Sequence, residues 1–123
     1  MATPDQYEEQ ARYNENWANR LTADPDVRHM EWGIVAAFYA AVHYLDAQIL
    51  IRLHHESQNH GDRFYHFRLL RPPNRVRDMY EQLFEASKQV RYEPFLSRPA
   101  FAYRDVRDFI DGELQGVKRW LGY

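Results

Sequence analysis

The chain has 123 residues, of which 45% are hydrophobic, 28% charged and 15% aromatic, and its net charge is −2. This length is enough for one domain with a hydrophobic core, so we treat residues 1–123 as a single domain. There is no cysteine, which excludes a disulfide framework, a thiol nucleophile and a zinc site built on thiolates.

The first predicted helix spans about Pro4–Leu21. Thr3 suits its N-cap, Pro4 suits the first helical position, and Gln6 completes a capping box. Apolar residues recur at helical spacing along one face, and Pro25 interrupts the pattern.

The second predicted helix follows a cap at Asp24 or Asp26 and runs to Leu53, a length of about 40 Å at ~1.5 Å per residue. From Trp32 to Leu45 it is apolar on every face except at His43. A helix that is apolar all round is buried all round. We therefore expect an all-α fold, an up-and-down bundle of four to five helices around this central helix.

Two features argue against a membrane protein. His43, Asp46 and Gln48 interrupt the apolar run of the central helix, so we expect no membrane span. No apolar segment follows a basic start at the N-terminus, so we expect no signal peptide and a cytoplasmic location.

The rest of the chain predicts further helices and no strand. Pro72 and Pro73 end one helix, because a residue before proline is disfavoured in helical conformation. The remaining elements are a polar loop (54–61), a helix capped by Asp62 (Arg63–Arg71), a helix capped by Asn74 and reaching about Arg91, an extended linker (93–99) and a last helix (about Pro99–Leu121).

Basic residues are concentrated in one segment. Residues 52–77 hold six arginines and four histidines, opposed only by Glu56 and Asp62. Arginine forks suit phosphate and carboxylate ligands. The segment is therefore either a phosphate-binding surface or a solvated arginine-rich surface with local acidic partners.

His43 is the one strongly polar side chain in the apolar part of the central helix. A buried imidazole needs a partner, so it is either a core histidine bonded to a tyrosine or a backbone carbonyl, or part of a functional pair. Asp46 lies three residues on, on nearly the same face, and the two side chains could orient each other.

His60 and Arg63 flank the N-terminus of the third predicted helix, a position that favours anions. Histidine can transfer a proton near neutral pH and arginine can stabilise a phosphorane, so the pair suits metal-free RNA cleavage. The alternative is a loop whose side chains only tie the chain together. Histidines and acids of the loop (His54, His55, Glu56 and His60) match no metal motif, so we expect no metal and no cofactor.

Several segments, taken in order, resemble the HEPN superfamily, and more narrowly its small stand-alone bacterial branch. They are Trp32-Gly33, the run Phe38–Tyr44, the loop end His60–Arg63, Tyr80 with Leu83, and Ser87 with Arg91-Tyr92. The resemblance covers about Tyr13 to the C-terminus. It implies an all-helical bundle that forms a homodimer. Many HEPN proteins are metal-independent ribonucleases of toxin–antitoxin, abortive-infection and CRISPR systems, and others are non-catalytic nucleotide-binding or scaffolding proteins.

This chain departs from the active members in one motif. Active HEPN nucleases carry an arginine, then four to six residues, then a histidine, and no pair in this sequence has that spacing. His60 and Arg63 present the same two side chains in reversed order.

Two functional hypotheses follow. In the first, the protein cleaves RNA in a toxin–antitoxin or phage-defence module, with a cognate antitoxin or nucleotidyltransferase as partner. The catalytic candidates, which we expect to meet in one cleft, are His43, Asp46, His60 and Arg63, and the phosphate- or RNA-binding candidates are Arg52, His55, His66, Arg68, Arg91 and Tyr92. In the second, it is a non-catalytic dimeric bundle that binds a nucleotide or a protein.

Overall fold

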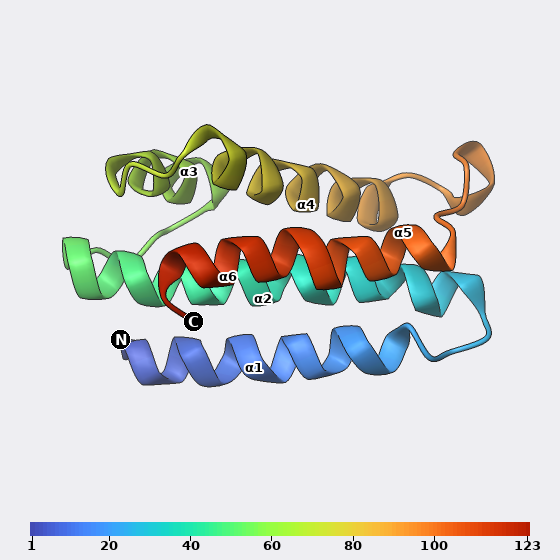
Figure 1. The fold of residues 1–123 in the computed structure, drawn as a ribbon, viewed down its shortest axis with the longest axis horizontal. Helices are drawn as coiled ribbons and strands as arrows, with labels where there is room; N and C mark the ends of the chain where they lie inside the picture. The colour runs from blue at the N-terminus through green and yellow to red at the C-terminus, as the bar shows by residue number, and fades with distance from the viewer.

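The computed structural model describes all of residues 1–123, and every regular element in it is helical (Figure 1). This confirms the predicted all-α bundle. The elements are α1 (Pro4–Leu21), α2 (Val27–Leu53), α3 (His60–Leu69), α4 (Asn74–Tyr92), a 3₁₀ turn η1 (Phe95–Ser97), and a last helix made of α5 (Tyr103–Asp108), the π-helical stretch η2 (Phe109–Leu114) and α6 (Gln115–Leu121).

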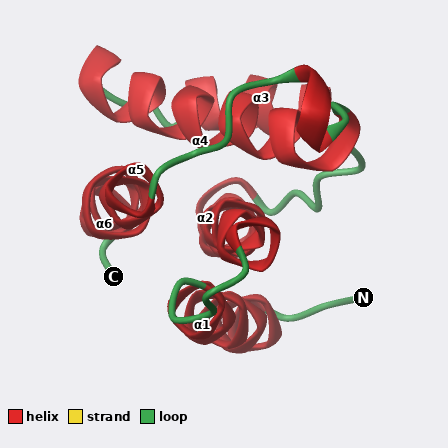
Figure 2. Cartoon of the chain, turned by 90° about the vertical axis from the view of Figure 1, so that its right-hand side faces the viewer, coloured by secondary structure: helices red, strands yellow, loops and turns green.

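Helix α2 is the centre of the arrangement. Seen end-on in Figure 2, α1 lies below it, α5 and α6 lie to one side, and α3 and α4 lie above. Figure 1 shows α1, α2 and the last helix running side by side, with both chain termini at the same end of the bundle.

The helix starts of α1 and α2 follow from their capping residues. The Thr3 hydroxyl accepts a hydrogen bond from the Gln6 amide, and the Gln6 side chain accepts one from the Thr3 amide, as a capping box requires. Asp26 caps α2 by accepting from the Arg28 amide at 2.9 Å. Asp24, the other candidate cap, accepts from the Asp26 amide instead.

The start of α3 differs from the prediction. The helix begins at His60 rather than Arg63, because Asn59 is the N-cap and accepts from the Asp62 amide at 2.8 Å. Asp62 therefore lies in the first turn instead of capping it. The helix ends at Leu69, two residues before the predicted end.

Two other boundaries were also wrong. Asn74 lies inside the first turn of α4, where its side chain accepts from Arg77 instead of capping the helix. The last helix begins at Tyr103, not near Pro99, because the chain before it is bound to a buried carboxylate. Glu31 of α2 pairs with Arg98 and accepts from the Phe101 amide.

A second, half-buried carboxylate joins three helices. Glu15 of α1 accepts from the Tyr44 hydroxyl of α2 at 2.9 Å, and from Gln115 and Lys118 of α6 at 2.8–3.0 Å. Charged and polar groups can be buried in this way only where each has a partner. This contact fixes how α1 and α6 are placed on α2.

The core is built on α2, but one face of that helix is open. Phe38, Leu45 and Ile49 are fully buried. The prediction that Trp32–Leu45 is buried on every side was nevertheless wrong. Four residues at helical spacing are partly open to solvent, and we call them the α2 strip: Trp32, Ala36, Tyr39 and His43. Trp32 is 45% exposed and the others are half-buried, because the helices packed on α2 leave this side uncovered.

By length and composition α2 could also cross a membrane. In this fold 67% of its most apolar window is buried inside the bundle. The core helix of a bundle meets the same criterion, so its apolar composition is accounted for by packing.

We predict that Ala40→Leu destabilises the fold. Ala40 has no exposed surface, and extra methylene groups in a packed core cost about 1–3 kcal/mol. The matched control is Ala36→Leu, the same change one turn earlier on the α2 strip, with an expected cost below about 0.5 kcal/mol. Urea unfolding of both variants measures the difference, and equal losses would contradict the close packing at Ala40.

Candidate functional site

The candidate site is centred on a buried ion pair between α2 and α3. The guanidinium of Arg63 donates from Nε to Asp46 Oδ1 at 2.7 Å and from Nη2 to Asp46 Oδ2 at 3.2 Å. Only 5% of Asp46 and 8% of Arg63 is exposed. Burial raises the pKa of Asp46, and hydrogen bonds from Arg63 oppose that shift. The pair anchors the short helix α3 to α2.

The same guanidinium fixes the protonation of His60. Arg63 Nη1 lies 2.9 Å from His60 Nδ1, and because arginine can only donate, Nδ1 must accept. Burial lowers the pKa of His60, and the charges of Arg63 and Arg91 lower it further. His60 is therefore neutral near pH 7, with its proton on Nε2.

His43 lies close to this group but outside its hydrogen bonds. Its ring stacks on Tyr7 of α1 at a centroid distance of 6.2 Å. Its Nδ1 is buried without a hydrogen-bond partner, so the tyrosine or carbonyl partner expected for a core histidine is missing there. Burial and the nearby charge of Arg63 lower the pKa of His43.

Arg91 of α4 provides a second cation next to His60. Its Nη1 donates to the hydroxyls of Tyr39 at 2.9 Å and Tyr92 at 3.3 Å. Its guanidinium carbon lies 4.8 Å from the ring centre of Tyr92, 5.5 Å from that of Tyr39 and 5.7 Å from that of Phe38. Its Nη2 is buried and has no partner.

Cations and rings alternate along this side of the molecule. Lys88 lies 5.2 Å from the ring centre of Phe84, and the ring of His60 lies 5.4 Å from that of Phe84. His60 and Arg91 then share contact with the buried ring of Phe38. We call the accessible members of this row the basic–aromatic face: Tyr39, His60, Phe84, Lys88, Arg91 and Tyr92.

The structure brings together only some of the predicted site residues. Asp46, His60 and Arg63 are in direct contact, His43 is nearby, and Arg91 with Tyr92 is in the adjoining row. Arg68 lines a neighbouring groove of mixed charge. Arg52 lies elsewhere: it donates to Gln48 and to the Leu121 carbonyl at the end of α6.

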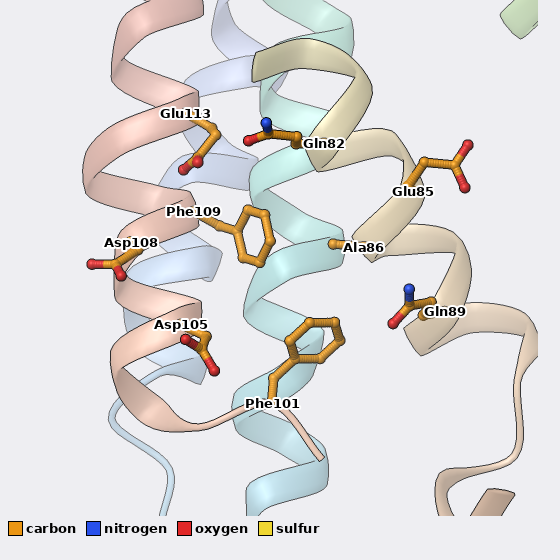
Figure 3. A pocket seen from close by; sticks show the side chains of 9 residues that line it. All are labelled: Gln82, Glu85, Ala86, Gln89, Phe101, Asp105, Asp108, Phe109 and Glu113. Carbon is orange, nitrogen blue, oxygen red and sulfur yellow. The ribbon is translucent and has the colours of Figure 1, made fainter. Parts of the chain in front are cut away.

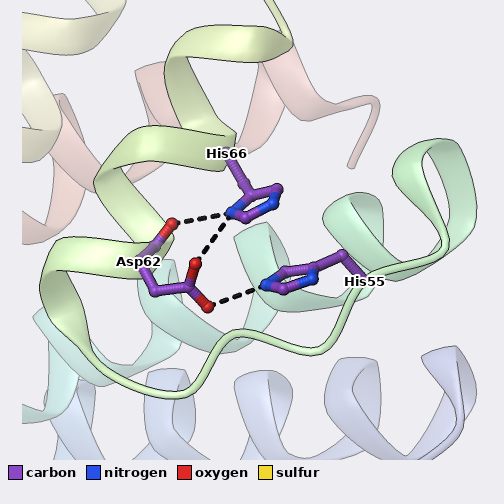
Figure 4. A group of neighbouring side chains, drawn as sticks. All are labelled: His55, Asp62 and His66. Atoms are coloured by element: carbon purple, nitrogen blue, oxygen red, sulfur yellow. Dashed lines mark hydrogen bonds and ion pairs between the residues drawn. The ribbon is translucent and has the colours of Figure 1, made fainter.

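His55 and His66, predicted to bind RNA, form a separate cluster with Asp62 (Figure 4). His55 Nε2 lies 2.7 Å from Asp62 Oδ2, and His66 Nδ1 lies 3.2 Å from Asp62 Oδ1. The hydrogen bond from His55 and that from the Gln58 amide keep the pKa of Asp62 below its ordinary value.

This cluster is the one group whose donor atoms are arranged for a metal ion. The sequence shows no metal motif among His54, His55, Glu56 and His60, so no metal was expected there. Of these four, only His55 belongs to the cluster, whereas Glu56 accepts from the Tyr7 hydroxyl and the Ala2 amide. The signal that could have found the cluster is the spacing of Asp62 and His66, four residues apart on one helix, which places them on the same face.

A cavity of about 440 Å³ opens between α4 and the last helix (Figure 3). The rings of Phe101 and Phe109 face into it, and its charged lining is purely acidic: Glu85, Asp105, Asp108 and Glu113. Because carboxylates repel phosphate, this cavity is not part of a site for RNA.

Comparison of the chain with models of protein families, with curated proteins and with solved structures finds no match in any of the three.

We predict that His43 makes the fold sensitive to acid. The unfolded chain takes up a proton at an ordinary histidine pKa of 6.5, whereas the folded pKa is lower. Stability is therefore fully present above pH 6.5 and falls as the pH drops below it, by at most about 1.4 kcal/mol per pH unit for this one group.

The variant His43→Phe keeps a ring against Tyr7 and removes the titration. Urea unfolding at about pH 7.5 and about pH 5.5 should show a smaller loss of stability for the variant than for the wild type. An equal loss in both proteins would show that His43 does not titrate differently on folding.

Proposed function

We propose that this protein is a HEPN-like bundle that binds single-stranded RNA through the basic–aromatic face without cleaving it. The observation that carries the proposal is Arg91, whose buried Nη2 has no partner within the protein. A buried donor left unpaired is costly. Once the guanidinium turns to bring Nη2 to the surface, a phosphate oxygen of a bound ligand would satisfy it through a charge-assisted hydrogen bond.

The alternation of rings and cations favours nucleic acid over a simple anion. Proteins that bind single strands combine positive charge along the backbone path with exposed rings on which bases stack. Tyr92 is 71% exposed and already lies against Arg91. Lys88, His60 and Arg91 supply donors along the same row.

The ion pair favours binding over catalysis. All three guanidinium nitrogens of Arg63 are already bound, to Asp46 and to His60. His60 Nδ1 is occupied by Arg63, and its Nε2 carries the proton, so His60 can donate a hydrogen bond to a phosphate but cannot accept a proton there. The missing Arg-x4-6-His motif agrees with this role.

A second candidate is the metal-independent cleavage of RNA in a toxin–antitoxin or phage-defence module. One observation favours it: His43 has a lowered pKa and an unpartnered Nδ1 close to Arg63. A neutral imidazole can accept a proton, which is what activation of a ribose hydroxyl requires, once the buried Nδ1 is brought within reach of the substrate.

We predict that Arg91→Gln and Tyr92→Ala weaken RNA binding. Loss of one stacking ring costs about 1–3 kcal/mol, or roughly 5- to 150-fold in the dissociation constant. Fluorescence anisotropy with a labelled single strand of about a dozen nucleotides, in EDTA, measures the change. The matched controls are Arg104→Gln and Tyr103→Ala, an exposed arginine and tyrosine on α5, which should leave binding unchanged.

The same samples separate the two candidates. Intact RNA after incubation with the wild type supports a binding protein. Cleavage that persists in EDTA and is lost in His43→Phe would establish the nuclease instead. Equal affinities of the Arg91 and Arg104 variants would remove the basic–aromatic face as the RNA site.

We further propose that the protein is a homodimer that joins through the α2 strip. Trp32 on this strip is 45% exposed, and Leu96, beyond the end of α4, is 93% exposed. Exposed apolar side chains mark interaction surfaces where they gather. A second copy seated on the strip would cover Tyr39, which also belongs to the basic–aromatic face, so the seam would border that face.

Light scattering at micromolar concentration should therefore give about twice the chain mass of 14.9 kDa. Trp32→Glu should shift the protein towards monomer, since it puts a charge at the seam, whereas Tyr103→Glu on α5 should not. A wild type that stays monomeric would rule out this assembly.

A further inference from the structure

The cluster of His55, Asp62 and His66 lies where the loop after α2 enters α3, and it shares no residue with the basic–aromatic face. We propose that these three side chains bind a divalent transition-metal ion, for which Zn²⁺ is the best match. The ion would join the loop to the first turns of α3.

The donor atoms already lie close to the spacing that a tetrahedral ion needs. With bonds of about 2.0–2.1 Å, two ligand atoms on one Zn²⁺ are about 3.3 Å apart. His66 Nδ1 and Asp62 Oδ1 are separated by 3.2 Å. His55 Nε2 lies 2.7 Å from the other carboxylate oxygen, Asp62 Oδ2, and the three ligand atoms lie within 4.8 Å of one another.

The rings of His55 and His66 stack almost in parallel, at a centroid distance of 3.6 Å and an angle of 11°. Because an imidazole nitrogen binds a metal in the plane of its ring, at least one ring would have to turn out of this stack for both nitrogens to reach one ion. Figure 4 shows a nitrogen of each ring directed at the Asp62 carboxylate. Asp62 and His66 are four residues apart on α3, the spacing at which two ligands share one helix face.

In the metal-free protein the two ring nitrogens that would bind the ion each carry a proton. His55 Nε2 donates to the carboxylate, and His66 Nδ1 donates to the Asp62 backbone carbonyl at 2.9 Å. A metal ion takes the place of these two protons, and each proton moves to the other nitrogen of its own ring. Each imidazole stays neutral and the carboxylate stays ionised, as metal ligation requires.

The ligand types select the class of metal. Two imidazoles and one carboxylate suit Zn²⁺ and its neighbours, whereas Mg²⁺ and Ca²⁺ prefer oxygen ligands alone. The side chains of His55, Asp62 and His66 are 34%, 24% and 15% exposed. The site is therefore open enough for a water molecule to complete a four-coordinate shell.

A bound ion would restrict the loop between α2 and α3. The loop is already bound to Asp62 through the Gln58 amide. An ion that also holds His55 and His66 would fix the turn that carries His60 and Arg63. The proposal does not depend on RNA binding, and its test contains no RNA.

The experiment is calorimetric titration of tag-free protein with ZnCl₂, followed by thermal unfolding with and without the ion. We expect one ion per chain, a raised unfolding midpoint, and no binding of Mg²⁺. Co²⁺ should give the strong visible absorption of a tetrahedral site. His55→Gln and His66→Gln should each weaken Zn²⁺ binding by at least about tenfold.

The matched control is His54→Gln, which removes the neighbouring exposed histidine and should bind Zn²⁺ as the wild type does. If the wild type binds no Zn²⁺, or if its affinity equals that of His55→Gln and His66→Gln, the cluster is only a hydrogen-bonded one. Circular dichroism of both variants without metal shows whether they are folded, and Co²⁺ absorption of the wild type gives the result without any variant.

Discussion

A helix that is apolar on nearly every side cannot be left in water, and this constraint on α2 determines the rest of the bundle. Covering it takes three partners, α1, α4 and the last helix, and the carboxylates Glu15 and Glu31 fix two of the contacts. One side of α2, the α2 strip, is not covered. The next residue along the same side is Asp46, which is buried, so its charge must be neutralised by a partner.

Arg63 is therefore first a structural residue. It supplies the charge that Asp46 needs, and in doing so it carries α3 onto the end of α2 and brings His60 against Phe38. As a result Arg63 is not available to a ligand, because a guanidinium whose three nitrogens are all hydrogen-bonded within the protein cannot also bind a phosphate. Arg91, by contrast, keeps a guanidinium nitrogen without a partner in the protein, and our proposal of binding without cleavage rests on this difference between Arg63 and Arg91.

The sequence was sufficient where a local rule decides the structure. The capping box at Thr3 and Gln6 and the all-round apolar pattern of α2 predict helices that the structure confirms. It was not sufficient where two nearby residues could both cap the same helix. Asn59 and Asp62, three residues apart, are both good caps, and in the structure Asn59 caps α3 by accepting from the Asp62 amide.

Contacts between distant elements were harder to predict. Asp46 and Arg63 are 17 residues apart, and their meeting depends on how the intervening loop turns. The π-helical stretch Phe109–Leu114 leaves no pattern that separates it from an ordinary helix. The surroundings of Arg91 are formed by rings of α2 and α4. The sequence therefore shows its charge but not that one of its nitrogens is left without a partner.

The loop 54–59 links the two proposed sites physically. His55 and Gln58 hold it to Asp62. Between them, Glu56 accepts from Tyr7, whose ring stacks on His43. At the end of the loop, Asn59 caps the helix that carries His60. Because a short loop has little freedom between such contacts, an ion that tightens the cluster also fixes the imidazole of His60 against Arg63. Metal binding and RNA binding would then favour the same conformation, and ligands that select one conformation bind cooperatively even when they never touch.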